Sequence, residues 1–191
     1  MTHPSSENNP RPEIVNIVGS GELNQSLDLL SVYSAIGPPL AKYDPEMYHG
    51  MYLFNDEENS LTATIYTSGS YIIVGAKTID ELSKTNQRIL NILSNTQKID
   101  DLTSLRFDVS NIVMSGDVGM ELELNQIAID LGLDNVEYDP ENFPGVVYTD
   151  KKNDCTMLIF RTGQITVTGA TSIDSMRRAY TDFAAMLPNS D

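Results

Sequence analysis

The sequence predicts an α+β fold with pseudo-two-fold symmetry, in which two direct repeats form a curved antiparallel sheet with helices on one face only. The prediction rests on an internal duplication and on the order of elements within each copy. Three pairs of matching segments follow one another in the same order, at 14–23 and 109–118, at 43–46 and 138–141, and at 75–80 and 169–174. Two copies are too few, and their spacing too long, for a solenoid. We therefore expect one pseudo-symmetric body whose paired surfaces recognise a roughly two-fold object.

Each copy has the pattern of a strand, a helix, three antiparallel strands and a second helix. Apolar residues at positions i, i+3, i+4 and i+7 predict the first helix of each copy, beginning near Leu29 and Leu124. Thr78, with Glu81 at capping-box spacing, and Ser172 are the expected N-caps of the second helices. The expected strands are 14–18, 47–54, 61–67 and 70–76 in the first copy, and 109–113, 143–149, 155–161 and 164–170 in the second.

The duplication also divides the chain. We assign residues 13–104 to the first repeat and 105–188 to the second, and expect the two to form one continuous body, because each alone would bury only a marginal core. Residues 1–12 are polar and rich in Pro and Asn, which predicts a disordered tail. No signal-peptide pattern and no apolar run of roughly 18 residues is found, so we expect a cytoplasmic protein.

The composition excludes several kinds of site. Cys155 is the only cysteine, so an internal disulfide is impossible. His3 and His49 are the only histidines, which disfavours a zinc centre. No nucleophile stands beside a base, and Asp80 and Asp174 fit helix starts, where acidic side chains favour the dipole. We therefore expect a protein that is not an enzyme and that needs no metal or cofactor.

The acidic net charge argues against a nucleic-acid ligand but also fits a protein from a salt-rich cytosol. The net charge is −15, from 12 basic and 27 acidic residues, which argues against a ligand rich in phosphate. An acidic surface is also what a salt-rich cytosol permits, because at about 1 M ionic strength the Debye length falls to about 3 Å. The composition therefore favours a protein from a halophile.

Period-two alternation sorts the strand residues onto two faces of the sheet. The face toward the helices should carry Val15, Ile17, Ala63, Ile65, Tyr71, Ile73, Ile112, Met157, Ile159, Ile165 and Val167. The other face should carry Asn16, Val18, Thr64, Tyr66, Ile72, Val74, Asn111, Val113, Leu158, Phe160, Thr166 and Thr168, none of which is charged. A half-apolar face without helices is typical of an interaction surface. The two asparagines have a second interpretation, in which each marks a bulge or bonds a neighbouring backbone.

Several duplicated motifs carry a resemblance to a known family. They are Asn-Ile-Val, Tyr-Asp-Pro-Glu followed by Phe143-Pro-Gly145, Leu158-Ile-Phe160-x-x-Gly163 and Thr168-Gly-Ala170. In this combination the chain resembles the TATA-box-binding proteins, which are general transcription initiation factors, over about residues 14–187. The acidic balance favours an archaeal, halophilic form.

The resemblance implies a saddle with helices on its convex face and a concave sheet on the DNA minor groove. This family is itself the standard example of proteins that wedge apolar side chains between base steps and bend the duplex. By resemblance the wedges are Phe143 and Phe160 with Tyr48 and Tyr66. Asn16 and Asn111 would bond bases at the dyad, Thr168 would bond a base, and Val18, Val113, Leu158 and Ile72 would line the floor. Val74, Lys77 and Thr166 complete the expected DNA-binding set.

The implied partners are promoter DNA, transcription factor B and, indirectly, RNA polymerase. The acidic balance adds a further expectation, that monovalent cations are taken up between acidic groups and phosphate at the DNA interface. Transcription factor B would bind the turn that contains Asp139, Glu141 and Asn142. The protein would be associated with the nucleoid. The alternative is a paralogue of the same fold that acts mainly as a protein–protein regulator. An enzyme on a duplicated scaffold would need a polar pocket, which the sequence does not indicate.

The first repeat departs most from the family pattern. It has Tyr at both wedge positions, Thr64 in place of the usual Leu, and Val74 where the second repeat has Thr168. Lysines that the family places beside the groove are replaced by Ser70, Gln164 and Thr171, and Lys77 is the one match. Arg177 and Arg178 are expected on a solvated helix face.

Overall fold

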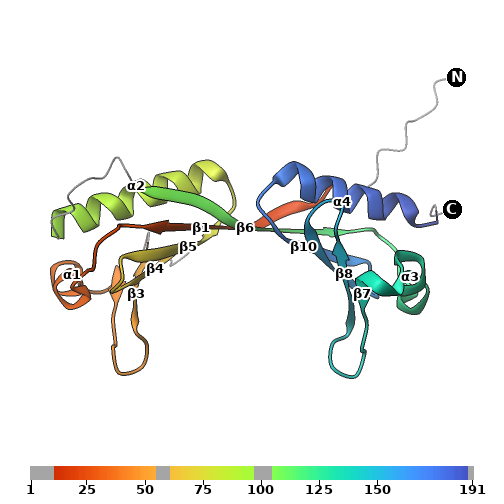
Figure 1. Cartoon of the computed structure of the whole chain (residues 1–191), viewed down its shortest axis with the longest axis horizontal. Helices are drawn as coiled ribbons and strands as arrows, with labels where there is room; N and C mark the ends of the chain where they lie inside the picture. Colours follow the sequence, from red (N-terminus) through yellow and green to blue (C-terminus); the bar gives the residue numbers. More distant parts are fainter. Residues whose placement is uncertain (1–10, 55–60, 97–104, 189–191) are drawn as a thin grey trace, which may run out of the picture. The chain divides into compact units, whose positions relative to one another are not determined.

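A computed structural model describes residues 11–54, 61–96 and 105–188 in two compact units. The first unit comprises residues 15–111, and the second comprises residues 112–191 together with the segment up to Ile14. The predicted disordered tail, residues 1–12, lies almost wholly outside the described residues. Figure 1 shows that each unit contains strands, a long helix, a short helix and a projecting hairpin.

In the first unit the strands are antiparallel neighbours in the order β2-β3-β4-β5-β1. The elements are β1 (Glu13–Glu22), α1 (Leu29–Ile36), β2 (Ala41–Lys42), β3 (Gly50–Phe54), β4 (Thr62–Tyr66), β5 (Ser70–Ala76) and α2 (Ile79–Thr96). The predicted order of elements is confirmed, with the two-residue strand β2 in addition. The turn between β2 and β3 projects on the side of the sheet away from α2 (Figure 1).

The second unit repeats this plan in the order β6-β10-β9-β8-β7. Its elements are β6 (Arg106–Asp117), α3 (Leu124–Leu131), the 3₁₀ helix η1 (Leu133–Asn135), β7 (Val136–Glu137), β8 (Gly145–Asp150), β9 (Cys155–Phe160), β10 (Gln164–Ala170) and α4 (Ile173–Met186). Here too a two-residue strand, β7, was not predicted. Over the described residues the expected antiparallel sheet and four α-helices are thus observed.

The predicted helix caps of α2 and α4 are confirmed. The Thr78 hydroxyl accepts from the Glu81 backbone N–H at 3.1 Å, and the Glu81 carboxylate accepts from the Lys77 N–H at 2.8 Å. The Ser172 hydroxyl accepts from the Ser175 N–H at 3.3 Å. These bonds occupy backbone donors that the first helical turn leaves without intrahelical partners, so they fix where each helix begins.

The helix-facing side chains form the core of each unit, as period two predicts, with one exception. Ile17, Ile73 and Ile159 are fully buried, whereas Val15 is 44% exposed. The prediction for Val15 was wrong because β1 pairs with β5 only from Ile17 onward. Val15 therefore lies beyond the part of β1 that pairs with β5, where alternation alone does not bring burial.

Each unit buries a tyrosine against a glycine of its first strand, but the two tyrosines come from different elements. In the first unit Tyr71 of β5 packs against Gly21, and its hydroxyl donates to the Asn86 side chain on α2 at 2.7 Å. In the second unit Tyr180 of α4 packs against Gly116. Tyr71 matches Ile165 in the repeat, and Tyr180 matches Asn86. The same volume is thus filled from the sheet in one copy and from the helix in the other.

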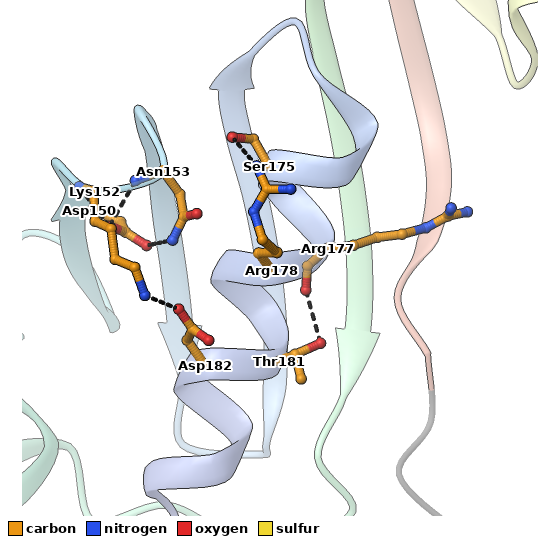
Figure 2. Close-up of polar contacts among 8 residues, drawn as sticks. All are labelled: Asp150, Lys152, Asn153, Ser175, Arg177, Arg178, Thr181 and Asp182. Atoms are coloured by element: carbon orange, nitrogen blue, oxygen red, sulfur yellow. Dashed lines mark hydrogen bonds and ion pairs between the residues drawn. The ribbon is translucent and has the colours of Figure 1, made fainter.

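Polar contacts hold the turn between β8 and β9 onto α4 (Figure 2). The Asp150 carboxylate accepts from the backbone N–H groups of Lys152 and Asn153 and, at 2.7 Å, from the Asn153 side-chain amide. The Lys152 ammonium donates to Asp182 at 2.7 Å. Both charges of this ion pair are largely exposed, so solvent screening leaves it only a small contribution to stability.

Candidate nucleic-acid interface

A β-bulge interrupts the sheet at the same place in both units. In the first unit Ile17 and Gly19 pair with Ala76 and Ile73, so β5 has one residue more than β1 across this interval. The same shift separates Val167 and Ala170 of β10. Gly75 and Gly169 lie in these bulges with φ of 101° and 91°. Glycine suits both positions because it adopts positive φ without a Cβ clash.

Asn16 is tied to the first bulge. Its side-chain oxygen accepts from the Gly75 backbone N–H at 2.8 Å, so the interpretation in which Asn16 bonds a neighbouring backbone is confirmed. The bond also sets the orientation of the amide, because a backbone N–H requires the oxygen. The NH₂ group, which can only donate, is directed away from Gly75. Asn16 is half-buried, so its amide lies within reach of the surface.

The predicted wedge residues form one aromatic pair in each unit. Tyr48, in the turn before β3, meets Tyr66 at the end of β4 with ring centroids 6.4 Å apart and planes at 65°. Phe143, in the turn before β8, meets Phe160 at the end of β9 at 5.7 Å and 61°. The hydroxyls of Tyr48 and Tyr66 lie 2.8 Å apart and share a hydrogen bond.

Each aromatic pair packs over a glycine of the adjacent strand. A Cβ on Gly50 would lie 2.8 Å from the Tyr48 ring and 3.1 Å from the Tyr66 ring. On Gly145 it would lie 3.0 Å from Phe143 and 3.1 Å from Phe160. Both glycines are therefore needed for space. The duplicated glycine was visible in the sequence, but it obscured the alternation at Tyr48 and its role was missed.

The sheet face opposite the core is continuous within each unit. Cross-strand pairs place Tyr52, Thr64, Ile72 and Ser20 in one row of the first unit, and Val147, Leu158, Thr166 and Ser115 in the matching row of the second. None of these eight side chains is charged. Ile72 and Val74 are each 38% exposed, which is unusual for large apolar strand residues.

Four members of these rows, Tyr52, Val147, Ser20 and Ser115, were predicted neither for this face nor as site residues, and Thr64 was expected on the face but not in the site. Tyr52 stacks on Tyr48, with centroids 5.4 Å apart and planes at 12°. The signal that could have found them is cross-strand register, since Tyr52 lies directly opposite Thr64 and Val147 directly opposite Leu158. The remaining predicted residues lie on strands: Val18 on β1, Val113 and Asn111 on β6, Leu158 on β9, and Thr166 and Thr168 on β10.

Basic side chains are scarce near these rows. Lys77 is exposed directly after β5, whereas the uncharged Gln164 donates to Ser115 of the neighbouring strand at 2.8 Å. Arg177 and Arg178 are exposed on α4, as expected for a solvated helix face. Arg178 donates to Ser175 on the same helix (Figure 2). Few cationic side chains are therefore available near these rows to contact a phosphate backbone.

The Tyr-Asp-Pro-Glu motif forms the same turn in both units. Asp139 accepts from the Glu141 N–H at 3.2 Å and from the Asn142 side chain at 2.6 Å. Asp44 accepts from the Glu46 N–H at 3.2 Å in the first unit. Glu141 is exposed. A cavity of about 250 Å³ beside the second turn is lined by Glu137, Tyr138, Asp139, Asn142, Phe143, Gly145 and Val147.

Other kinds of site find no support in the described parts of the chain. No group of three or more His, Cys, Asp or Glu side chains there could hold a metal ion. No helix within the same ranges is long and apolar enough to cross a membrane. Burial, together with the nearby Asp150 and Asp154, raises the pKa of Cys155 to about 11. The thiol therefore stays protonated and unreactive at neutral pH.

Comparison with known proteins agrees with this geometry. The family model described as transcription factor TFIID (or TATA-binding protein, TBP) matches twice, at residues 11–96 and 106–189. The chain belongs to the TATA-binding protein family. Members of this family are transcription factors and not enzymes, and the chain is accordingly a general transcription initiation factor.

The chain is similar to several archaeal TATA-box-binding proteins, mostly from halophiles. The chain is 38% identical to TATA-box-binding protein C of Halobacterium salinarum over 90% of this chain and 94% of that one. It is 39% identical to the TATA-box-binding protein of Haloarcula marismortui over 82% of each. The solved structure of Methanococcus jannaschii TBP is similar with a TM-score of 0.75 and 29% identity, over 93% of this chain and all of that one.

Proposed function

We propose that this protein binds the TATA element of archaeal promoters through the DNA minor groove and bends the duplex. The observation that carries the proposal is the aromatic pair packed over a glycine, Gly50 or Gly145, on the helix-free face of each unit. Aromatic rings at the end of an apolar row are suited to enter a base step, because stacking on a base replaces the water that the ring displaces. Two matched copies suit a ligand that is itself roughly two-fold.

The uncharged rows fit the chemistry of A·T pairs. In the minor groove these pairs present only acceptors, adenine N3 and thymine O2, and no guanine amino group projects from the floor. Ile72, Val74 and Leu158 supply an apolar surface against such a floor. Asn16, whose oxygen is held by Gly75, supplies donors alone toward acceptors, and Asn111 is its counterpart in the second repeat. Thr166 and Thr168 supply further hydroxyl groups.

We also propose that the second turn recruits transcription factor B, and through it RNA polymerase. Asp139 holds the turn, so the contact falls mainly to the exposed Glu141 and to Asn142. The adjoining cavity of about 250 Å³ offers an acidic-edged hollow for a basic partner. Because the turn projects away from α4, a partner could bind there without contacting that helix (Figure 1).

The charge of the chain shapes how DNA is bound. With a net charge of −15, the protein and the phosphates repel one another at low salt. We propose that monovalent cations are taken up between acidic side chains and phosphates in a salt-rich cytoplasm, where the protein is associated with the nucleoid. In this state the two repeats would act as one body on the duplex.

A second candidate function is that of a paralogue that acts mainly through protein partners and binds DNA weakly. The scarcity of cations beside the rows favours it, since Lys77 is the one basic residue among the proposed DNA contacts.

A bend-sensitive measurement decides between the two functions. A TATA duplex labelled with a donor and an acceptor fluorophore at its ends is titrated with the protein from low salt to molar potassium chloride, beside a duplex in which G·C pairs replace the element. Energy transfer that rises with the TATA duplex alone supports promoter binding. No change at any salt, on protein shown to be folded, favours the paralogue.

A further inference from the structure

We infer that Tyr48 and Tyr66 act as one hydrogen-bonded unit that presents a hydroxyl donor to a base acceptor, so that the first repeat reads the minor-groove edge at the step it opens. The inference rests on the proposed function. It concerns the one feature in which the two aromatic pairs differ chemically, because the second pair, Phe143 and Phe160, has no polar atom in its side chains.

The hydrogen bond leaves one proton for an outside acceptor. The two hydroxyl oxygens are 2.8 Å apart, and either can be the donor. Whichever donates, the accepting hydroxyl still carries its own proton, which the bond between the two does not use. This bond raises the pKa of Tyr48 above its usual value, so the phenol is protonated at neutral pH. The pair thus carries one unused donor on its polar edge.

Neighbouring rings hold this hydrogen-bonded pair in place. The Tyr52 ring stacks on the Tyr48 ring with centroids 5.4 Å apart. The centroid of the His49 ring lies 4.9 Å from that of Tyr48 and 5.8 Å from that of Tyr66. The repeat places Pro144 and Val147 where the first unit has His49 and Tyr52. The Tyr48–Tyr66 pair is therefore more restricted in its motion than a single tyrosine without these ring contacts would be. A donor fixed in advance loses less entropy when it meets its acceptor.

Minor-groove acceptors are the matching chemistry. Adenine N3 and thymine O2 line the floor, and a phenol entering a base step passes between them. A tyrosine driven into the stack would otherwise give up water without replacing it, at a cost in affinity. Because a guanine amino group would place a donor in the same region, the pair should also discriminate against G·C at this step.

The test removes hydroxyls from the protein and acceptors from the DNA in one double-mutant cycle. Binding and bending are measured for TATA duplexes in which single adenines are replaced by 3-deazaadenine, or single thymines by a difluorotoluene isostere. The proteins compared are the wild type, Tyr48→Phe/Tyr66→Phe and the reciprocal Phe143→Tyr/Phe160→Tyr. The conservative changes keep both rings over their glycines, and melting curves check the fold.

The wild type should lose about fivefold in affinity at one or two positions in the half-site of the first repeat, as expected for one neutral hydrogen bond. The double Phe variant should lose less than about twofold at the same positions, and the reciprocal variant should gain a sensitive position in the other half-site. Equal losses for wild type and double Phe variant, or no sensitive position on a duplex that the wild type bends, would overturn the inference. Failure of the wild type to bend the unmodified duplex would instead overturn the proposed function.

Discussion

In the first unit the paired rings are tyrosines that share a hydrogen bond and contact His49 and Tyr52, whereas in the second they are phenylalanines. The geometry is nearly the same, with plane angles of 65° and 61°. A glycine opposite the second ring of each pair sets that geometry, because a Cβ there would collide with the rings. The backbone thus determines where the pair lies, and the side-chain tips determine what it can recognise.

The buried tyrosines show that, in the core as well, two positions of similar shape can differ in hydrogen bonding. Tyr71 bonds Asn86, while the Tyr180 hydroxyl is buried without a hydrogen-bond partner among the described residues. A tyrosine on the strand in one unit and on the helix in the other fills the same volume, but only the strand tyrosine has a hydrogen-bond partner for its hydroxyl among the described residues. A duplicated fold can therefore diverge in chemistry at positions where its shape is conserved between the copies.

The largest difference between the units should appear in partner recruitment. Glu141→Arg reverses a charge on the second turn and should abolish the ternary complex with transcription factor B while DNA binding remains, because opposed charges at an interface select partners. Glu46→Arg, in the matching turn of the first unit, is the control and should leave recruitment intact. Native gel shifts with both proteins measure this. A normal ternary complex with the Glu141 variant would remove the turn from the interface.

Substitutions at Asn16 separate its bond to the Gly75 backbone from its proposed bond to a base. Asn16→Asp keeps an acceptor for the Gly75 N–H but loses the donors, and should weaken specific binding about 100-fold because a carboxylate then faces acceptors. Asn16→Ala and Asn111→Ala should weaken binding with melting temperatures within a few degrees, as for losses near about 1 kcal/mol. Binding isotherms and melting curves are needed for each variant. A large loss of stability with unchanged binding would make the asparagines structural.

Removal of one ring tests the aromatic pairs. Phe160→Ala should reduce TATA affinity by about 10- to 100-fold, as expected when a stacked ring is lost. Tyr66→Ala should cost no more than this, because the desolvation of the phenol tip offsets what its bond to a base acceptor gains, whereas a phenyl ring has no such cost. Affinity and bend angle are measured for both. A clearly larger loss of affinity for Tyr66→Ala would mean that the aromatic pair of the first repeat contributes more to binding than that of the second.

The smallest effect concerns the two buried hydroxyls. Tyr71→Phe should lower the free energy of unfolding by about 1 kcal/mol, since it removes the bond to Asn86. Tyr180→Phe should leave it unchanged or raise it slightly, because the lost hydroxyl has no bond to give up. Denaturant unfolding at molar salt compares the two variants with the wild type. Equal destabilisation by both would mean that Tyr180 has a partner that the contacts of this unit do not include.

Much of the fold followed from local pattern. The apolar stripes from Leu29 and Leu124, the caps at Thr78 and Ser172, and the alternation along β4, β5, β9 and β10 all depend on neighbours within a few residues. The short strands β2 and β7 could not be predicted because two residues carry no periodicity. Val15 was misassigned because its burial depends on how far β5 extends beside β1.

The candidate site followed from the sequence only in part. Motifs gave the wedge pairs and the asparagines, but the bond from Gly75 to Asn16 depends on a bulge that only cross-strand register reveals. The hydrogen bond between Tyr48 and Tyr66 joins residues on different strands, and the part played by Tyr52 depends on stacking. Contacts of this kind are set by tertiary geometry, which no local window contains.

We propose that an uncharged sheet face with aromatic wedges, rather than lysine and arginine contacts, supplies the affinity of this acidic protein for DNA. The most direct measurement is log affinity against log salt for a fixed TATA duplex on folded protein. Contacts between basic residues and phosphates release counterions and give a slope near −0.9 per contact, whereas apolar burial is not screened. Binding should therefore be weak at low salt and should stay level or strengthen toward molar potassium chloride. A steep negative slope throughout the range would contradict it.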